Sequence, residues 1–229
     1  MIYVTADIHG NSARFDSVMT QIQLKPEDTL YILGDVVDRF PDGIKLLRRI
    51  MKMPNVHMLL GNHEYMMLKA IQSLETSDGK PPYSREIRHW YHNGGDVTHS
   101  YLKHIRKDLR TEVFDYVRSL PLNLEIQAGD RKYKLVHGSP VENFPTGHKK
   151  IYESLTEFAV WERWQPGDPV PEGYIMIFGH TPTPHLQDGE PWRIWHGKNA
   201  VGIDCGCGYA QGRLLCLRLD DMREFYSED

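Results

Sequence analysis

Short apolar runs alternate with amphipathic segments over the first third of the chain. The runs at 2–6, 29–33 and 56–60 have the length of buried strands, and each is followed by polar residues and a glycine. Between the runs, apolar residues recur at helical spacing, at Phe15, Val18, Met19 and Ile22 and at Ile44, Leu46, Leu47 and Ile50. This alternation predicts a βαβαβ unit with parallel strands and right-handed crossovers.

The rest of the chain changes character. Helical patterns occupy about 76–120, and we interpret this segment as a helical insertion because it has few core residues of its own. Residues 121–138 alternate as a β-hairpin does. Apolar runs predict further strands at 174–178, 200–204 and 213–219. We therefore expect an α/β fold with a second sheet, in a single domain over 1–229.

Composition and charge exclude several classes of function. The net charge of −4, with neutral His, indicates no general polyanion-binding face, so we expect no nucleic-acid partner. No apolar run approaches the ~20 residues that cross a bilayer, and the chain starts in a strand, so we expect no membrane partner, no leader segment and a cytoplasmic location. Three cysteines make no disulfide framework, which fits a reducing compartment.

Metal-type ligands follow five of the predicted strands. They are Asp7, His9, Asp35, Asn62, His137 and His180. Because sites in open α/β sheets gather at the carboxyl ends of strands, these side chains are expected to meet. Carboxylates, imidazoles and an amide oxygen suit two divalent ions, and a pair of ions about 4 Å apart suits phosphoryl transfer. The structural alternative, helix caps and buried core histidines, explains one such ending but not five.

The motifs that carry these residues resemble the signature of the calcineurin-like metallophosphoesterases. They are Asp7-Ile8-His9-Gly10, Gly34-Asp35-Val36-Val37-Asp38-Arg39, Gly61-Asn62-His63-Glu64, His137-Gly138 and Gly179-His180-Thr181. The Asp38-Arg39 pair resembles the phosphoprotein phosphatase branch, which includes small bacterial and phage serine/threonine phosphatases and symmetrical diadenosine tetraphosphatases. Phosphodiesterases of the wider superfamily usually carry a second His where this chain has Pro182.

The resemblance implies a fold and a division of roles. The fold is a four-layer α/β/β/α sandwich, and the expected metal ligands are the six residues Asp7, His9, Asp35, Asn62, His137 and His180. Asp35 bridges the two ions, and a metal-bridging hydroxide attacks phosphorus in line. His63 protonates the leaving oxygen and Asp38 holds its imidazole. Arg39 binds the phosphate, and Arg163 is the expected second phosphate ligand; its alternative is a surface Arg in a loop.

The activity implied is hydrolysis of phosphate monoesters, and we expect phosphoserine or phosphothreonine in proteins as the substrate. The alternative is a symmetrical bis(5'-nucleosyl)-tetraphosphatase. A non-catalytic phosphoprotein-binding module is the third reading, but no ligand or acid is missing. The resemblance implies two divalent ions; manganese is expected, and Fe, Zn, Co or Ni suit the ligands as well. The partner is the phosphorylated protein or small phosphate ester, and no regulatory subunit is implied.

Two other segments contain residues that could have a function. Residues 90–95 resemble a segment of the bacterial phosphatases, and we expect either a substrate mouth with Asn93 near a substrate oxygen or a glycine-capped helix end. A preference for dinucleotides would make the same segment a candidate adenosine pocket. Cys205 and Cys207 are interpreted as small buried thiols without a role, because their spacing does not match the common metal or redox motifs.

Overall fold

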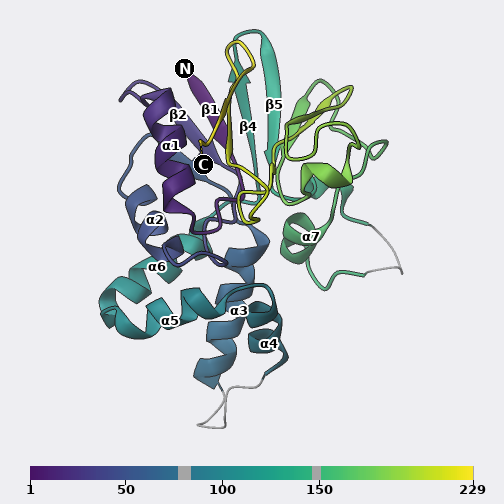
Figure 1. Cartoon of the computed structure of the whole chain (residues 1–229). Coiled ribbons are helices and arrows are strands. Elements are labelled where there is room, and N and C mark those ends of the chain that lie inside the picture. Colours follow the sequence, from purple (N-terminus) through teal and green to yellow (C-terminus); the bar gives the residue numbers. More distant parts are fainter. Residues whose placement is uncertain (77–83, 146–150, 229) are drawn as a thin grey trace.

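The computed structural model describes residues 1–76, 84–145 and 151–228 (Figure 1). Its first sheet has five strands in the order β10-β9-β1-β2-β3. These strands are β1 (Ile2–Thr5), β2 (Thr29–Ile32), β3 (Val56–Met58), β9 (Leu215–Arg218) and β10 (Arg223–Tyr226). The predicted parallel unit is present, since β1 pairs with β2 and β2 with β3 in parallel. Strands β9 and β10 extend this sheet in antiparallel fashion, and β10 was not predicted.

The second sheet also has five strands, in the order β4-β5-β6-β8-β7. They are β4 (Asn123–Ala128), β5 (Arg131–Val136), β6 (Ile175–Phe178), β7 (Trp195–His196) and β8 (Ala200–Gly202). The predicted hairpin is β4 with β5, whose register places Asn123 opposite Val136. Strands β5, β6 and β8 run parallel, so their carboxyl ends lie at the same edge.

Apolar side chains fill the space between the two sheets. Val4 of β1 and Leu217 of β9 share a buried cluster with Leu135 of β5, Ile177 of β6 and Val201 of β8. Helices cover the outer face of the first sheet, and α7 (Leu155–Trp161) lies below the end of β5 (Figure 1). The expectation of a mixed α/β fold with two sheets flanked by helices is confirmed.

Helices α1 to α3 follow the strands of the first sheet. They are α1 (Ser12–Ile22), α2 (Gly43–Ile50) and α3 (Asn62–Thr76). Each begins directly after a strand-end turn, and Asn11 caps α1 by accepting the N–H of Arg14 at 3.1 Å. The buried faces of these helices pack on the first sheet through Phe15, Leu47 and Met67. No described helix is long and apolar enough to span a bilayer.

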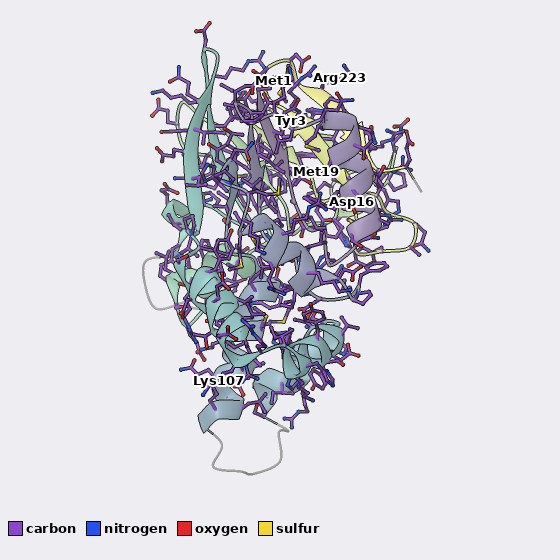
Figure 2. The ribbon with its side chains drawn as sticks, turned by 90° about the vertical axis from the view of Figure 1, so that its left-hand side faces the viewer. Met1, Tyr3, Asp16, Met19, Lys107 and Arg223 are labelled. Atoms are coloured by element: carbon purple, nitrogen blue, oxygen red, sulfur yellow. The ribbon has the colours of Figure 1, made fainter. Side chains whose placement is uncertain are left out.

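The predicted helical insertion contains α4 (Arg85–His92), α5 (Asp96–His104) and α6 (Lys107–Ser119). Its buried residues Trp90, Leu102 and Val117 belong to the same apolar cluster as the helices on the first sheet. Figure 2 places Lys107, at the start of α6, at the opposite end of the molecule from Met1 and Arg223. The segment thus packs at the end where β1 and β2 finish (Figure 1). Residues 77–83, which belong to the segment predicted as helical, lie outside the described residues.

Candidate active site and metal centre

In the turns that follow the strands, several of the candidate site residues have a left-handed backbone conformation. Residues with positive φ are Asp7 (55°), His9 (52°), Asp35 (55°), Asp38 (71°), Arg39 (67°) and His180 (59°). This conformation is unfavourable for non-glycine residues and requires support from the surrounding structure. Hydrogen bonds between adjacent turns supply part of that support, because the His9 N–H donates to the Asp35 carbonyl at 2.9 Å. The turns therefore hold each other in register.

Asp35, at the end of β2, lies at the centre of the site. Two groups of possible metal ligands share it: Asp35 with His9 and His63, and Asp35 with His137 and His180. Its Oδ1 lies 3.5 Å from His137 Nε2 and its Oδ2 lies 3.9 Å from His9 Nε2. Burial alone would raise the pKa of Asp35, but the imidazoles of His137, His63 and His9 lower it below its ordinary value. The shared carboxylate is therefore ionised.

The expected ligand histidines are oriented by backbone carbonyls. The Nδ1–H of His9 donates to Val37 O at 3.3 Å, and the Nδ1–H of His137 donates to Leu33 O at 2.5 Å. His180 uses its Nε2–H instead, donating to Trp161 O at 3.1 Å. Burial lowers the pKa of all three imidazoles and so favours the neutral form of each ring. One nitrogen of each ring is thus left as a lone-pair donor, as in metal-ligating histidines.

Asn62 meets His137 in a way that indicates a shared cation. The Asn62 side-chain oxygen lies 2.9 Å from His137 Nε2. Since the other nitrogen of this ring donates to a carbonyl, Nε2 carries a lone pair, and two lone-pair atoms face each other. Such a pair is unfavourable by itself and is satisfied when both atoms ligate one metal ion.

Asp7 and Asp204 are two further buried carboxylates beside Asp35. Burial raises the pKa of Asp7, and the charges of Asp204 and Asp35 raise it further. Burial also raises the pKa of Asp204 to about 6. Asp7 accepts the His180 N–H at 3.1 Å and, although outside the two ligand groups around Asp35, lines the same pocket. Crowded carboxylates and neutral imidazoles fit divalent cations, which relieve the repulsion between the carboxylates.

Asp204 is a residue of the pocket that the sequence analysis did not select. It follows β8, is 5% exposed and lines the pocket with Asp7 and Asp35. One of its oxygens accepts the Gly206 N–H at 3.0 Å. Its sequence signal was the same as that of the selected ligands, a carboxylate directly after an apolar run.

His63 and Asp38 form a buried pair beside the metal ligands. The Nδ1 of His63 lies 2.8 Å from Asp38 Oδ2, and both side chains are at most 2% exposed. Burial would lower the pKa of His63, but the charges of Asp35 and Asp38 raise it above its ordinary value. Its Nε2 points to the pocket, 3.8 Å from Asp35 Oδ2 and 3.5 Å from Arg39 Nη2. This geometry suits a proton donor held by a carboxylate.

Two arginines, Arg39 and Arg163, line the pocket. The Arg39 N–H donates to Gly94 O at 3.0 Å, and its guanidinium lies 4.8 Å from the ring centre of Tyr209. Arg163 donates from Nη1 to His180 O at 2.8 Å. Both arginines and Tyr209 line the pocket, so they lie where phosphate oxygens would be bound.

Glu64 supports the turn that carries Asp35. Its Oε2 accepts the Asp35 N–H at 2.9 Å, and its Oε1 accepts the N–H groups of Val36 and Val37 at 2.8 and 3.2 Å. Glu64 is fully buried on α3, and burial raises its pKa to about 7. Glu64 belongs to one of the motifs in the sequence, but its role could not be predicted because the residues that it contacts are distant in the sequence.

The residues of the segment 90–95 lie partly on the wall of the pocket and partly in the protein interior. Asn93 lines the pocket, but Trp90 is fully buried and donates its Nε1–H to both oxygens of Asp38. A buried ring offers no face to an adenine base, so the adenosine pocket suggested for a dinucleotide substrate is not formed by Trp90. Cys205 and Cys207 are free and buried, in agreement with the interpretation of small interior thiols.

Comparisons with known proteins agree with this geometry. The chain is 28% identical over 188 residues to serine/threonine-protein phosphatase 2 of Salmonella typhimurium, covering 78% of each. It is 25% identical over 276 aligned residues to the symmetrical bis(5'-nucleosyl)-tetraphosphatase of Citrobacter koseri, covering 97% of this chain and 93% of the relative. The solved cold-active protein-tyrosine phosphatase of a psychrophilic Shewanella has the same fold, with a TM-score of 0.59 at 17% identity, covering 99% of this chain and 80% of that one.

The family assignment rests on the full length of the fold and on the ligands at its strand ends. The profile of the calcineurin-like phosphoesterases matches residues 1–217. This range includes all six expected metal ligands and the His63–Asp38 pair. The two ligand groups around Asp35 fit the dinuclear divalent metal site of that family. The chain belongs to the calcineurin-like phosphoesterase family.

Proposed function

We propose that this chain is a metal-dependent phosphatase of phosphate monoesters, with phosphoserine and phosphothreonine residues of proteins as its substrates. The observation that carries the proposal is the arrangement around Asp35. Two groups of metal-type ligands share this carboxylate, and the side chains of His63 and Arg39 face the same pocket.

The metal ions would be held by the side chains at the strand ends. The residues proposed as ligands are Asp7, His9, Asp35, Asn62, His137 and His180. When bound, two divalent ions lower the pKa of the attacking water and offset the negative charge of the phosphate. We propose manganese because oxygen and nitrogen ligands together suit it, and Fe, Zn, Co and Ni are the alternatives for the same set.

The protein side chains bind the phosphate and protonate the leaving group. Arg39 and Arg163 bind the phosphate oxygens, each through N–H groups that the guanidinium presents in a fixed plane. His63 holds a proton at Nε2 and passes it to the leaving oxygen as the bond from that oxygen to phosphorus breaks. Asp38 accepts the other ring proton of His63 as a hydrogen bond and keeps the imidazole oriented.

A cavity beside the site supports a protein substrate over a polyphosphate. It shares Trp161 with the catalytic pocket and lies between α3, α4 and α7. Its walls carry the carboxylates of Glu86, Glu153 and Glu157 as well as two cations. Because the carboxylates outnumber the cations, this wall suits a polypeptide of mixed charge better than the four consecutive phosphates of a dinucleoside tetraphosphate.

Symmetrical cleavage of dinucleoside tetraphosphates is the second candidate. The tetraphosphatase of Citrobacter koseri matches 97% of this chain, which favours that reaction. The alignment spans 276 positions, more than the 229 residues of this chain, so the relative carries insertions that this chain lacks. A shorter chain is expected to enclose its substrate less, which favours a protein segment as the substrate.

A paired assay on the manganese-loaded protein tests the proposal. The kcat/KM for a phosphothreonine peptide is expected to exceed that for diadenosine tetraphosphate by at least about tenfold, a difference of ~1.4 kcal/mol in transition-state binding. The reverse preference would assign the chain to the tetraphosphatases. If neither these substrates nor p-nitrophenyl phosphate is hydrolysed, and His63→Asn changes nothing, the chain is a binding module and the catalytic proposal is wrong.

A further inference from the structure

Trp90 contacts the Asp38 carboxylate of the buried pair and is not among the residues that line the pocket. Its Nε1 lies 2.9 Å from Asp38 Oδ2 and 3.1 Å from Asp38 Oδ1, and Trp90 and Asp38 are both fully buried. The same Asp38 Oδ2 lies 2.8 Å from His63 Nδ1. Indole, carboxylate and imidazole thus form one chain of hydrogen bonds that ends at His63 Nε2, in the pocket.

Asp38 needs this support because of where its backbone and charge lie. Its φ of 71° is unfavourable for a non-glycine residue, and its carboxylate is removed from water. The Asp38 N–H donates to Thr98 Oγ1 at 3.0 Å. Trp90 is on α4 and Thr98 on α5, so both ends of Asp38 are held by the helical insertion.

The packing around Trp90 aims its N–H at the carboxylate. Gly95 lies against the edge of the indole, where an added Cβ would be 2.2 Å from Nε1. Any side chain at 95 would displace the ring from Asp38. A phenylalanine ring at position 90 would fill most of the same apolar space in the core cluster but would have no donor for Asp38.

We propose that Trp90 is a positioning residue for leaving-group protonation: its N–H fixes the Asp38 carboxylate, and this carboxylate aims the His63 imidazole at the leaving oxygen. The inference rests on the proposed function, in which His63 is the proton donor. In the step concerned, the His63 Nε2 proton moves to the leaving oxygen as that oxygen separates from phosphorus. Trp90 keeps its own proton throughout, so it acts only through Asp38.

The test is the dependence of rate on the leaving group. The alcohol of phosphothreonine leaves poorly without a proton, whereas p-nitrophenol leaves readily without one. Because a positioned acid contributes about 10²–10⁴-fold, Trp90→Phe is expected to lower kcat for a phosphothreonine peptide about tenfold and kcat for p-nitrophenyl phosphate less than about twofold. A purely structural loss would lower both rates by the same factor.

Trp164→Phe is the matched control. Trp164 is 4% exposed and also donates its Nε1–H, to Pro169 O at 3.2 Å, but it packs in the cluster on the second sheet. This variant is expected to keep the wild-type ratio of the two rates. Thermal unfolding of both variants is measured alongside. If Trp90→Phe does not fold, 3-benzothienylalanine at position 90 keeps the shape of the ring and removes only the N–H.

A double-mutant cycle separates this inference from the proposed function. In a His63→Asn background, the Trp90→Phe change is expected to have no further effect on phosphothreonine hydrolysis, because the residue it positions is gone. An equal additional loss in that background, or an equal loss for both substrates, would overturn the role of Trp90. Absence of phosphatase activity in the wild-type protein would instead overturn the proposed function.

Discussion

The carboxylate of Glu64 holds the backbone of Asp35. Its Oε2 accepts the Asp35 N–H at 2.9 Å across 29 positions of sequence, while its Oε1 accepts the N–H groups of the next two residues. The first turn of α3 thus fixes the turn after β2. Asp35, the carboxylate common to both groups of possible metal ligands, is thus positioned by a helix that begins with two other residues of the pocket, Asn62 and His63.

Replacing Glu64 with Gln should destabilise the fold. One carboxylate oxygen becomes an NH₂ group that faces backbone N–H donors, so buried donors lose their acceptor at a cost of about 1–3 kcal/mol. Urea unfolding measures this change. Glu75→Gln, an exposed substitution on the same helix, is the control and should shift stability by less than about 0.5 kcal/mol. Equal midpoints for the two variants would contradict the role assigned to Glu64.

Loss of the Asp35 carboxylate should weaken binding at both proposed metal positions. Because Asp35 belongs to both ligand groups, Asp35→Asn is expected to weaken every Mn²⁺ site at least about tenfold, whereas His180→Asn should spare one. Isothermal titration calorimetry gives the number of ions bound. His185→Asn changes an exposed histidine outside the pocket and should leave the wild-type stoichiometry. One tight site remaining in Asp35→Asn would show that the carboxylate is not shared.

The three cysteines should be unreactive in the folded protein. Cys205, Cys207 and Cys216 are free and buried. Burial raises the pKa of Cys207 to about 12 and also raises the pKa values of Cys205 and Cys216, so the reactive thiolate is scarce at pH 8. Ellman's reagent is expected to label none of them until denaturant is added. Rapid labelling of the native protein would require an opening at Cys205 or Cys207.

The cluster around Lys134 should make stability depend on pH in the acid range. Glu125 accepts hydrogen bonds from the Tyr174 hydroxyl at 2.7 Å and from Lys134 Nζ at 3.0 Å, and these contacts lower the pKa of Glu125 below its ordinary 4.5. A carboxylate with a lowered pKa stabilises the folded state above its ordinary pKa, and this stabilisation is lost as the pH falls through the folded-state value.

Glu125→Gln should therefore flatten the fall in stability between about pH 5 and pH 3, where the unfolded chain takes up the proton first. Thermal unfolding at a series of pH values measures the slope. Glu172→Gln, at an exposed carboxylate, is the comparison and should keep the wild-type slope. Parallel curves for all three proteins would mean that Glu125 contributes nothing.

The sequence predicted the strands and their polar ends because both depend on local pattern. A strand length of apolar residues followed by Asp or His is visible at Asp7, Asp35 and His137 without knowledge of the fold. The helical character of the segment 76–120 was predicted for the same reason, but the bounds of α4, α5 and α6 are known only from the structure. The short edge strands β7 and β10 were missed because neither carries a buried run of its own.

The supporting residues were not predicted because they act across long separations. Trp90 meets Asp38 over 52 positions, and nothing near Trp90 in the sequence indicates a carboxylate partner. Asp204 had the pattern of a strand-end ligand but lay outside the motifs that carried the resemblance. The residues proposed as ligands could therefore be selected from the sequence, whereas the residues that position them depend on how distant helices pack.

Six of the nine described non-glycine residues with positive φ lie in the site: Asp7, His9, Asp35, Asp38, Arg39 and His180. This concentration bears on how such a chain changes over generations. At these turns, selection for stability and selection for catalytic activity oppose each other. Glycine would fit the backbone conformation better, but only the present side chains can perform the chemistry. A descendant that no longer needed the reaction would be expected to acquire glycine at these positions first. Substitutions in the turns would then precede substitutions in the apolar core.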